Sequence, residues 1–328
     1  MEDYIMIKMA IMGAGAIAIK MAATIGQMEN VEAYAIAARN MERAEKFAKE
    51  YDFTKAYGSY EEMLKDENVD LVYIAVPHTF HYKCTKMCLE AGNNVLCEKP
   101  FCVNAIQAKE VIRMAEEKQL LLTEAIWTRY MPSRKMIDDI IASGVIGEIT
   151  SLTANLGYEL SKVKRIWTPQ LAGGALLDVG IYLIHFARMV FGEKEAEITS
   201  KALFRDGVDV IDSIVMTFED GKVATMQSNV SAIQNRKGSI FGTKGYIEIT
   251  NINNPEEIRI FDSDYKEIEV LKVPEQITGY EYEVKACIKA IENDEVECDE
   301  IPHIETIKVM EIMDSIRNSW EYEVPVIN

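Results

Sequence analysis

The fold of this chain is set by one early segment, Ile7-Lys8-Met9-Ala10-Ile11-Met12-Gly13-Ala14-Gly15-Ala16-Ile17-Ala18. Its apolar residues 7–11 predict a strand, and residues 13–27 predict a turn that leads into a helix. The turn fits G-x-G-x-x-A, in which Gly13 permits a sharp bend and Gly15 lets the backbone approach a pyrophosphate. The small Ala18 allows close packing of helix on strand. A strand before the motif and a helix after it favour dinucleotide binding over a tight turn without a ligand.

The first 125 residues alternate short apolar runs with segments of helical period. This pattern predicts an N-terminal Rossmann domain over residues 1–125, with a doubly wound parallel sheet covered by helices. The apolar run Val69–Val76 is typical of a strand buried on both faces, and Ser59 with Glu62 predicts a helix-capping box. Further strands are predicted over residues 31–38, 94–97 and 120–123. One helix is predicted over residues 41–51, another ends at residue 91, and a third starts at residue 104.

The second half changes to longer alternating segments, which predict strands over residues 148–158, 198–204, 210–218, 222–230, 236–241 and 246–249. Asp220-Gly221 and Gly242–Gly245 indicate tight turns between neighbouring strands. We therefore expect residues 126–328 to form an α+β domain on an open, mostly antiparallel sheet that binds substrate and forms oligomers. Two closing helices, over residues 280–292 and 303–320, are able to pack back on the first domain.

Charge and composition exclude several classes of partner. The chain has 328 residues, of which 48% are hydrophobic, and 35 basic against 53 acidic side chains give a net charge of −18. Such a field repels phosphate backbones and anionic lipids, so we expect no nucleic-acid or membrane partner. An anionic cofactor then needs a local cluster of donors.

The cysteines and the first residues point to the cytoplasm. None of the six cysteines forms a Cys-x-x-Cys pair or a cluster with zinc spacing, so we expect reduced thiols and no metal. The start carries Glu2 and Asp3, and Lys8 interrupts the apolar run, unlike a signal peptide. We also expect no apolar run of the roughly 18 residues that span a bilayer.

The end of the second predicted strand bears on the choice of cofactor. NAD enzymes usually place Asp or Glu there to bind the ribose 2′-hydroxyl. This chain reads Ala37-Ala38-Arg39-Asn40 and adds Arg43 one helical turn later. Two guanidinium groups suit a 2′-phosphate, so NADP is favoured over NAD. The alternative is that both arginines are solvated residues at a helix start.

A lysine follows the strand that ends at Cys97, in the tripeptide Glu98-Lys99-Pro100. In a doubly wound sheet the carboxyl ends of the strands face the ligand crevice, which places Lys99 well for chemistry. Pro100 is suited to a cis bond in a tight turn. By itself the tripeptide fits equally a surface lysine beside a strand-ending proline.

Several segments together resemble the glucose–fructose oxidoreductase / inositol dehydrogenase (Gfo/Idh/MocA) family. They are the glycine turn, Glu98-Lys99-Pro100 and the run Gly173-Gly174-Ala175-Leu176-Leu177-Asp178-Val179-Gly180-Ile181-Tyr182. Two more, Glu124-Ala125-Ile126-Trp127-Thr128-Arg129-Tyr130 and Ala38-Arg39 with Arg43-Ala44, are similar to its dimeric dihydrodiol dehydrogenase / NADP-dependent D-xylose dehydrogenase branch. The resemblance covers essentially the whole chain.

The resemblance implies that Lys99 and Tyr182 carry catalysis, with Asp178 nearby. Free tyrosine, with a pKa of about 10, is a weak base at neutral pH, and a neighbouring ammonium favours its phenolate. Asp178 and Tyr182 are four residues apart, so on a helix they share a face. Relatives in the inositol dehydrogenase branch carry histidine where this chain has Tyr182. We assign proton transfer to Tyr182 rather than to His185, which we expect to pack in the core.

The resemblance also implies binding residues. Those expected at the cofactor are Gly13, Gly15, Ala16, Ile17, Arg39, Arg43, Pro77, His81, Glu98 and Lys99. Those expected at the substrate are Trp127, Arg129, Asp178 and Tyr182. His78 is balanced between a place near the nicotinamide and a plain helix start, and Trp127 has the alternative of packing at the domain junction.

These expectations describe an oxidoreductase that moves a hydride between NADP and a hydroxyl-bearing carbon of a sugar, polyol or trans-dihydrodiol. One alternative is a non-catalytic regulator that binds a dinucleotide and a sugar. Retention of Lys99, Asp178 and Tyr182 together argues against it. Another is the same chemistry on an inositol or keto-sugar. The resemblance further implies a homodimer or larger homo-oligomer through the C-terminal sheet.

Overall fold

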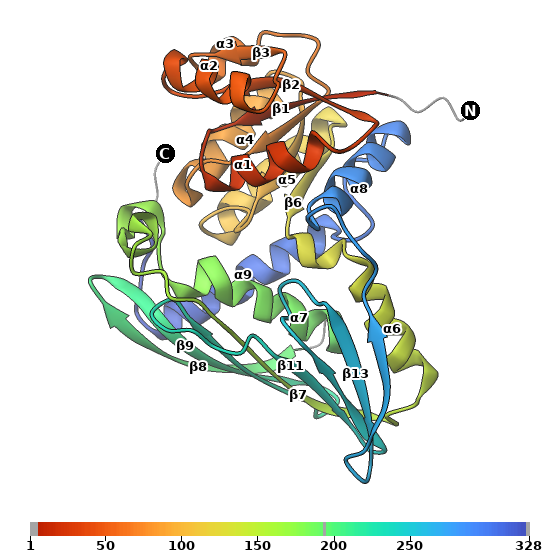
Figure 1. The fold of residues 1–328 in the computed structure, drawn as a ribbon. Helices are drawn as coiled ribbons and strands as arrows, with labels where there is room; N and C mark the ends of the chain where they lie inside the picture. Colours follow the sequence, from red (N-terminus) through yellow and green to blue (C-terminus); the bar gives the residue numbers. More distant parts are fainter. Residues whose placement is uncertain (1–5, 193–194, 326–328) are drawn as a thin grey trace. The chain divides into compact units, whose positions relative to one another are not determined.

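The computed structural model describes residues 6–192 and 195–325, which form two compact units (Figure 1). The first unit contains the described residues up to Tyr130 together with Gln276–Met310. The second contains Met131–Glu275 and Glu311–Pro325. The predicted domain boundary after residue 125 stays a prediction, because compactness alone does not show that each part folds by itself.

The first unit is built on a parallel sheet of six strands in the order β3-β2-β1-β4-β5-β6. The strands are β1 (Ile7–Met12), β2 (Val31–Ala37), β3 (Lys55–Tyr57), β4 (Leu71–Ile74), β5 (Asn94–Glu98) and β6 (Leu122–Ala125). This is the strand order of a doubly wound nucleotide-binding fold, so the predicted Rossmann architecture is confirmed. All residues of β4 are buried, as its continuous apolar sequence predicts. The short β3 was not predicted.

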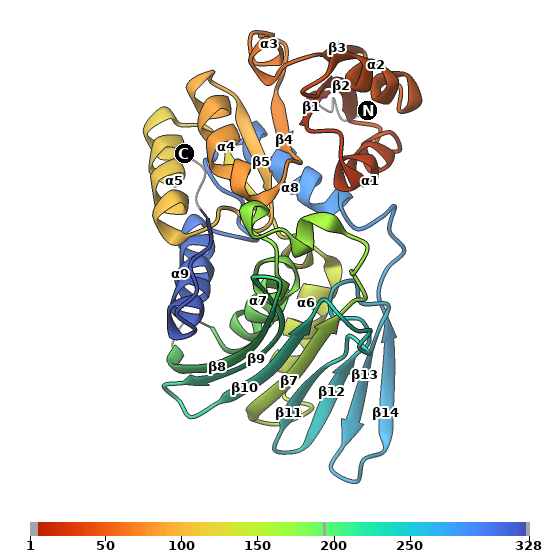
Figure 2. The same cartoon turned by 90° about the vertical axis from the view of Figure 1, so that its left-hand side faces the viewer.

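Helices lie on both sides of this sheet (Figure 2). They are α1 (Ala16–Ile25), α2 (Met41–Glu50), α3 (Tyr60–Met63), η1 (His78–Phe80), α4 (His81–Glu90), α5 (Ala105–Lys118), η2 (Trp127–Arg129), α8 (Glu281–Glu292) and the beginning of α9 (His303–Ser319). The Ser59 hydroxyl accepts a hydrogen bond from the Glu62 amide at 3.2 Å, which confirms the predicted cap of α3.

The second unit is built on an eight-stranded sheet in the order β14-β13-β12-β11-β7-β10-β9-β8. The strands are β7 (Ile149–Gly157), β8 (Glu195–Arg205), β9 (Val208–Phe218), β10 (Val223–Asn229), β11 (Gly238–Gly242), β12 (Gly245–Ile249), β13 (Glu257–Asp262) and β14 (Glu267–Lys272). Only β7 and β10 pair in parallel; the other pairs are antiparallel, as predicted. Both predicted tight turns are present, whereas β13 and β14 lie beyond the predicted strands.

One face of this sheet is covered and the other is open. The helical segments of this unit are α6 (Pro132–Ser143), η3 (Lys164–Trp167), η4 (Pro169–Leu171), η5 (Leu176–Gly180), α7 (Ile181–Phe191) and the end of α9. Of these, η5 and α7 pack against the central strands β7 and β10. Along β9, Ile214 and Met216 are fully buried, whereas Ser213 is exposed and Val215 half-exposed. This alternation is typical of an antiparallel sheet with a single packed face.

The prediction that no run has the length and apolarity of a membrane span was wrong. Pro169–Phe191 has 23 residues and a mean hydropathy of 1.5, and 83% of its apolar window is buried inside the protein. A core helix of a soluble protein has these same properties.

Candidate functional site

The glycine turn after β1 is constrained by the neighbouring strand. Gly13 has a φ of +106°, and a Cβ there would lie 2.6 Å from the carbonyl oxygen of Ala75. Only glycine fits such a conformation and such a close approach. A Cβ on Gly15 would meet no protein atom nearer than 3.9 Å, so the protein leaves room beside that residue.

Helix α1 begins at this turn with its first amides uncapped. Its N-cap is Gly15, and no side chain accepts a hydrogen bond from the first turn. The first turn of a helix carries unpaired N–H groups and the positive end of the helix dipole, which together favour an anion.

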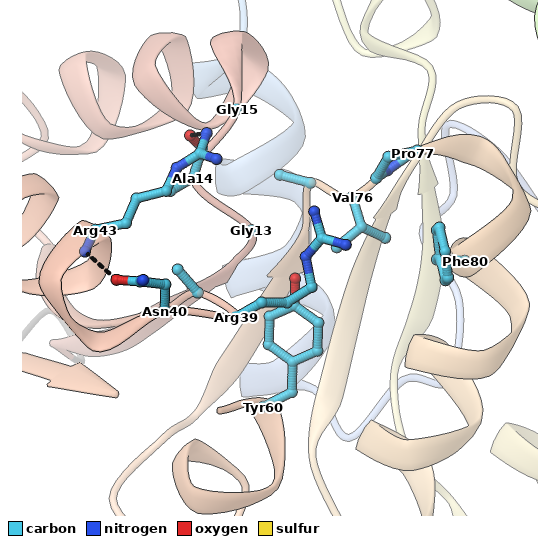
Figure 3. Close-up of a pocket in the computed structure, with 12 residues that line it drawn as sticks. Gly13, Ala14, Gly15, Arg39, Asn40, Arg43, Tyr60, Val76, Pro77 and Phe80 are labelled. Atoms are coloured by element: carbon cyan, nitrogen blue, oxygen red, sulfur yellow. Dashed lines mark hydrogen bonds between the residues drawn. The ribbon is translucent and has the colours of Figure 1, made fainter. Parts of the chain in front are cut away.

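A cavity of about 530 Å³ opens beside the turn (Figure 3). Its lining residues come from the segments that follow β1, β2, β3 and β4: Gly13, Ala14, Gly15, Ala38, Arg39, Asn40, Arg43, Tyr60, Ala75, Val76, Pro77 and Phe80. The carboxyl ends of parallel strands are where ligands bind in this class of sheet.

Two arginines supply the charge of the cavity. Arg43 donates a hydrogen bond from its guanidinium to the carbonyl of Ala14 at 2.5 Å, which ties α2 to the glycine turn. Asn40 caps α2 by accepting from the Arg43 amide at 3.1 Å. Arg39 lies in the same wall as Tyr60 (Figure 3). Burial raises the pKa of Tyr60, so its hydroxyl stays protonated and uncharged beside the arginines.

These features fit a phosphorylated dinucleotide. The open side of Gly15 and the amides of α1 suit a pyrophosphate, and the two guanidinium groups suit a further phosphate. No Asp or Glu occurs among the described residues that line the cavity. Of the predicted cofactor residues, Gly13, Gly15, Arg39, Arg43 and Pro77 line it.

The other predicted cofactor residues lie outside this lining. Ala16 and Ile17 form the first turn of α1. His81 is 1% exposed, and its Nδ1 and Nε2 lie 2.7 and 2.9 Å from the carbonyl oxygens of Pro100 and Val76. Because carbonyl oxygens only accept, both contacts are hydrogen bonds only when the ring carries both protons. His81 therefore connects the end of β4 with the loop after β5, and a contact of its own with a cofactor stays a prediction.

Lys99 stands directly after β5 and is half-buried, and the Lys99–Pro100 peptide bond is cis. Glu98 is buried and accepts hydrogen bonds from the Tyr73 hydroxyl and, at 3.2 Å, from the Lys99 amide. The Glu98 carboxylate thus supports the backbone that carries Lys99. Cofactor contacts by Glu98 and Lys99 stay predictions.

The segment after β6 is held by contacts inside the first unit. Trp127 stacks on Tyr280 with ring centroids 4.4 Å apart and planes at 7°. Arg129 forms an ion pair with Glu305 at 2.5 Å, and these side chains are only 10% and 9% exposed. The predicted substrate contacts of Trp127 and Arg129 remain untested. His78 begins the short helix η1 and is buried.

The second unit carries Asp178 on η5 and Tyr182 on the adjoining α7. Both side chains are almost fully buried, at 4% and 8% exposure. The Arg165 guanidinium pairs with Asp178 at 2.8 Å, which orients that carboxylate. His185 is fully buried on α7. Lys99 and Tyr182 belong to different units, so their convergence stays a prediction.

Some candidate residues escaped sequence reasoning. Tyr60 lines the cavity, and its only signal was its position directly after the capping residue Ser59. Arg165 reaches Asp178 across 13 positions of the chain, a separation at which no local pattern exists. Among the described residues no group of three or more His, Cys, Asp or Glu is arranged to hold a metal ion.

A parallel sheet of this order, with a glycine turn and a cationic cavity at its carboxyl edge, defines a dinucleotide-binding protein. Residues 7–126 match the family model "Oxidoreductase family, NAD-binding Rossmann fold". Residues 135–248 match "GFO/IDH/MocA C-terminal domain". The chain is an NAD(P)-binding oxidoreductase and belongs to the Gfo/Idh/MocA family, as the sequence motifs indicate.

Similar curated proteins are trans-1,2-dihydrobenzene-1,2-diol dehydrogenases. The Xenopus tropicalis protein is 39% identical over 217 residues, 66% of each chain. The Mus musculus protein is 34% identical over 280 residues, 84% of this chain and 82% of its own. Among solved structures, a 3-ketoreductase from Actinomadura kijaniata in complex with NADP and TDP-benzene has a TM-score of 0.88 at 24% identity, covering 95% of this chain and 97% of that one. At 24% identity this similarity shows a shared fold and no more.

Proposed function

We propose that this dehydrogenase uses NADP and moves a hydride to or from a hydroxyl-bearing carbon of a trans-dihydrodiol or a sugar. The curated relatives bear the name of a dihydrodiol dehydrogenase, which supports the diol. A structure of the same fold is an aldose-aldose oxidoreductase from Caulobacter crescentus, with a TM-score of 0.87 at 19% identity over 96% of this chain and 97% of that one. A sugar is therefore the second substrate class to test.

The proposal of NADP rests on one observation, the charge of the cavity. Arg39 and Arg43 line it, and no carboxylate of the described part of the chain does so. A 2′-phosphate pairs with guanidinium groups, whereas a ribose 2′-hydroxyl is usually bound by a carboxylate. Because the whole chain carries a net charge of −18, this local cluster is what offsets the repulsion of an anionic cofactor.

The chemistry needs a group that moves a proton at the substrate oxygen. The bound nicotinamide supplies or accepts the hydride. Tyr182 takes the hydroxyl proton during oxidation and returns it to the developing alkoxide during reduction. The Lys99 ammonium favours the phenolate of Tyr182, and Asp178, oriented by Arg165, binds substrate hydroxyl groups.

The test is a comparison of NADP and NAD in steady-state oxidation of trans-dihydrobenzenediol, D-xylose, other aldoses and inositols. We expect NADP to give the higher kcat/KM, and Arg39→Ala to weaken NADP by about tenfold to 100-fold, as for a lost charge-assisted hydrogen bond. Binding of NAD to that variant should change little.

Arg113→Ala is the matched control, because Arg113 is a largely exposed arginine on α5 outside the cavity lining. A preference of the native protein for NAD, or an equal loss of NADP affinity in both arginine variants, would overturn the choice of cofactor. Dinucleotide binding without turnover on any substrate would favour the regulator instead.

We also propose that the chain works without a metal, in the cytoplasm, as a homodimer or larger homo-oligomer. All six cysteines are free and buried, which suits a reducing compartment. The open face of the eight-stranded sheet carries a row of aromatic rings, which supports association through that face.

A further inference from the structure

Two buried aspartates on β9, Asp209 and Asp212, lie against the segment that begins the helix of Asp178 and Tyr182. Asp209 is 3% exposed and Asp212 is fully buried. Segment η5 packs on three consecutive strands of the sheet, β7, β10 and β9. Neither aspartate has a role in the proposed chemistry. Burying a carboxyl group lowers the stability of the folded protein unless hydrogen bonds compensate for the lost contact with water.

Asp209 caps the helix start from a neighbouring strand. Its Oδ2 accepts a hydrogen bond from the Leu176 amide at 2.6 Å, and its carboxyl also accepts from the Ala175 amide. These are N–H groups that the first turn of a helix leaves unpaired, and no side chain of η5 itself caps them. A negative charge at this end also interacts favourably with the helix dipole.

The Gly173-Gly174 turn leaves room for the Asp209 carboxyl group beside the start of the helix. Gly174 has a φ of +110°, and a Cβ on it would overlap the Oδ1 atom of Asp209. On the other side, the Gly174 amide donates to the Ile166 carbonyl at 2.9 Å, and a Cβ on Gly173 would overlap that same carbonyl. The helix start is therefore held between the Ile166 carbonyl of η3 and the Asp209 carboxylate of β9.

Asp212 is the second buried carboxyl of this arrangement, three residues further along β9. Its Oδ2 accepts from the Ser228 hydroxyl at 2.7 Å, while its buried Oδ1 has no donor among the described residues. The Asp212 carboxyl also interacts with the Asp209 carboxyl. Two carboxylates in contact cannot both be ionised away from water.

The two environments decide which aspartate is charged. Burial, and then the neighbouring Asp209, raise the pKa of Asp212 well above its ordinary value. Burial also raises the pKa of Asp209, but the backbone amides that it accepts from oppose this effect. The two environments thus favour the proton on Asp212 and the negative charge on Asp209.

We propose that Asp209 and Asp212 share one proton and hold the start of the η5–α7 helix in place, which makes Asp209 a positioning residue for the reaction. The inference rests on the proposed roles of Asp178 and Tyr182. Asp178 follows the capped Leu176 by two residues and Tyr182 by six, so a shift of this turn displaces both. A misplacement of 1 Å at a reacting group is able to cost on the order of 100-fold in rate.

The test compares Asp209→Ala, Asp212→Asn and Asp212→Leu with the native enzyme in steady-state kinetics. Asp212→Asn keeps an acceptor for Ser228 and a donor for Asp209, so it imitates the protonated acid and should retain kcat. Asp212→Leu removes the donor to Asp209 and should lose part of kcat. Asp209→Ala should lower kcat by about 100-fold. Binding of NADPH, measured by fluorescence, should be unchanged in all three, because its cavity belongs to the first unit.

Infrared spectroscopy gives a readout that does not depend on activity. The difference spectrum between the native enzyme and Asp212→Asn at neutral pH should contain the carbonyl stretch of a buried protonated carboxyl, because protonated Glu124 contributes equally to both spectra. The difference spectrum between the native enzyme and Glu117→Gln, at an exposed carboxylate, should lack that band. If Asp209→Ala fails to fold, this band and the kinetics of Asp212→Asn still decide the matter.

Three results would overturn the inference: native kcat in Asp209→Ala, a defect in Asp212→Asn as large as in Asp209→Ala, or no protonated carboxyl band in the difference spectrum between the native enzyme and Asp212→Asn. Tyr182→Phe separates this inference from the proposed function. If that variant turns over normally, the proposed chemistry itself is wrong. If it is inactive while Asp209→Ala is fully active, only the positioning role is wrong.

Discussion

At the scale of single residues, the buried carboxyl of Glu124 titrates near neutral pH. It accepts hydrogen bonds from the Phe101 amide at 3.0 Å and the Thr306 hydroxyl at 3.2 Å. Burial nevertheless raises the pKa of Glu124 from 4.5 to about 7, because desolvation outweighs these hydrogen bonds. The folded protein thus holds a proton that the unfolded chain releases.

This linkage predicts a pH dependence of stability. Between about pH 4.5 and 7 the folded state binds more protons than the unfolded state, so the free energy of unfolding falls as pH rises. The loss from this group is about 3 kcal/mol once the pH has passed the folded-state pKa. Glu124→Gln imitates the protonated acid, so urea unfolding across this range should show a smaller decrease than in the native protein. Glu117→Gln, at an exposed site, should leave the slope unchanged; an unchanged slope in Glu124→Gln would refute the linkage.

At the scale of elements, the turn from β1 into α1 couples stability to cofactor binding. Gly13→Ala places a Cβ in a left-handed conformation and 2.6 Å from the Ala75 carbonyl. We expect it to lower the free energy of unfolding by about 2 kcal/mol or more and to weaken NADPH binding. Denaturant unfolding and fluorescence titration measure the two effects.

Gly92→Ala is the matched control for this turn. Gly92 also has a positive φ, of +84°, but a Cβ there meets no atom within 4 Å. It should cost only the conformational strain, about 1 kcal/mol, and leave NADPH binding intact. Equal losses of stability in Gly13→Ala and Gly92→Ala would mean that the close contact with Ala75 does not contribute to the loss.

The elements also show how far sequence reasoning reaches. The strands of the Rossmann sheet were predictable because a strand buried on both faces is continuously apolar, as Val69–Val76 is. Strand β14 (Glu267–Lys272) was missed because it is a short, almost fully exposed strand at the edge of the sheet, without a buried apolar face. The short β3 has only three half-buried residues, too few for any period.

Those parts of the site whose residues are close together in the sequence were predictable, and those whose residues are far apart in the sequence were not. The glycine turn and the two arginines are within one βαβ unit, so spacing alone brought them together. The pairing of Arg165 with Asp178, and of Asp209 with the Leu176 amide, depends on how loops and strands of the second unit pack. No periodicity along the chain encodes such contacts.

At the scale of the whole molecule, the open face of the second sheet is the candidate for self-association. Tyr246 stands opposite Phe241 on β11 and Phe261 on β13, and its ring stacks on that of Phe261 with centroids 4.6 Å apart. All three are half-buried and alternate along their strands with the buried residues Ile240, Ile247 and Ile260, so they lie on the opposite face of the sheet. Aromatic side chains are enriched where protein surfaces meet.

If the proposed oligomer forms through this face, Tyr246→Glu should convert it into monomers, as measured by light scattering after gel filtration. A charge in the centre of a desolvated apolar patch is unfavourable, whereas a charge on the rim costs little. Ile106→Glu is the control, since Ile106 is 78% exposed on α5 in the other unit. An oligomer that survives Tyr246→Glu unchanged would place the interface elsewhere.

The most direct test of the account is a crystal structure with NADP and a diol or sugar bound. We predict that the 2′-phosphate contacts Arg39 and Arg43, and that the Tyr182 hydroxyl lies about 3 Å from the substrate oxygen, with the Lys99 ammonium beside it. A complex in which Tyr182 and Lys99 lie far from the reacting carbon, while the cofactor occupies the cavity above Gly13, would contradict the proposed chemistry.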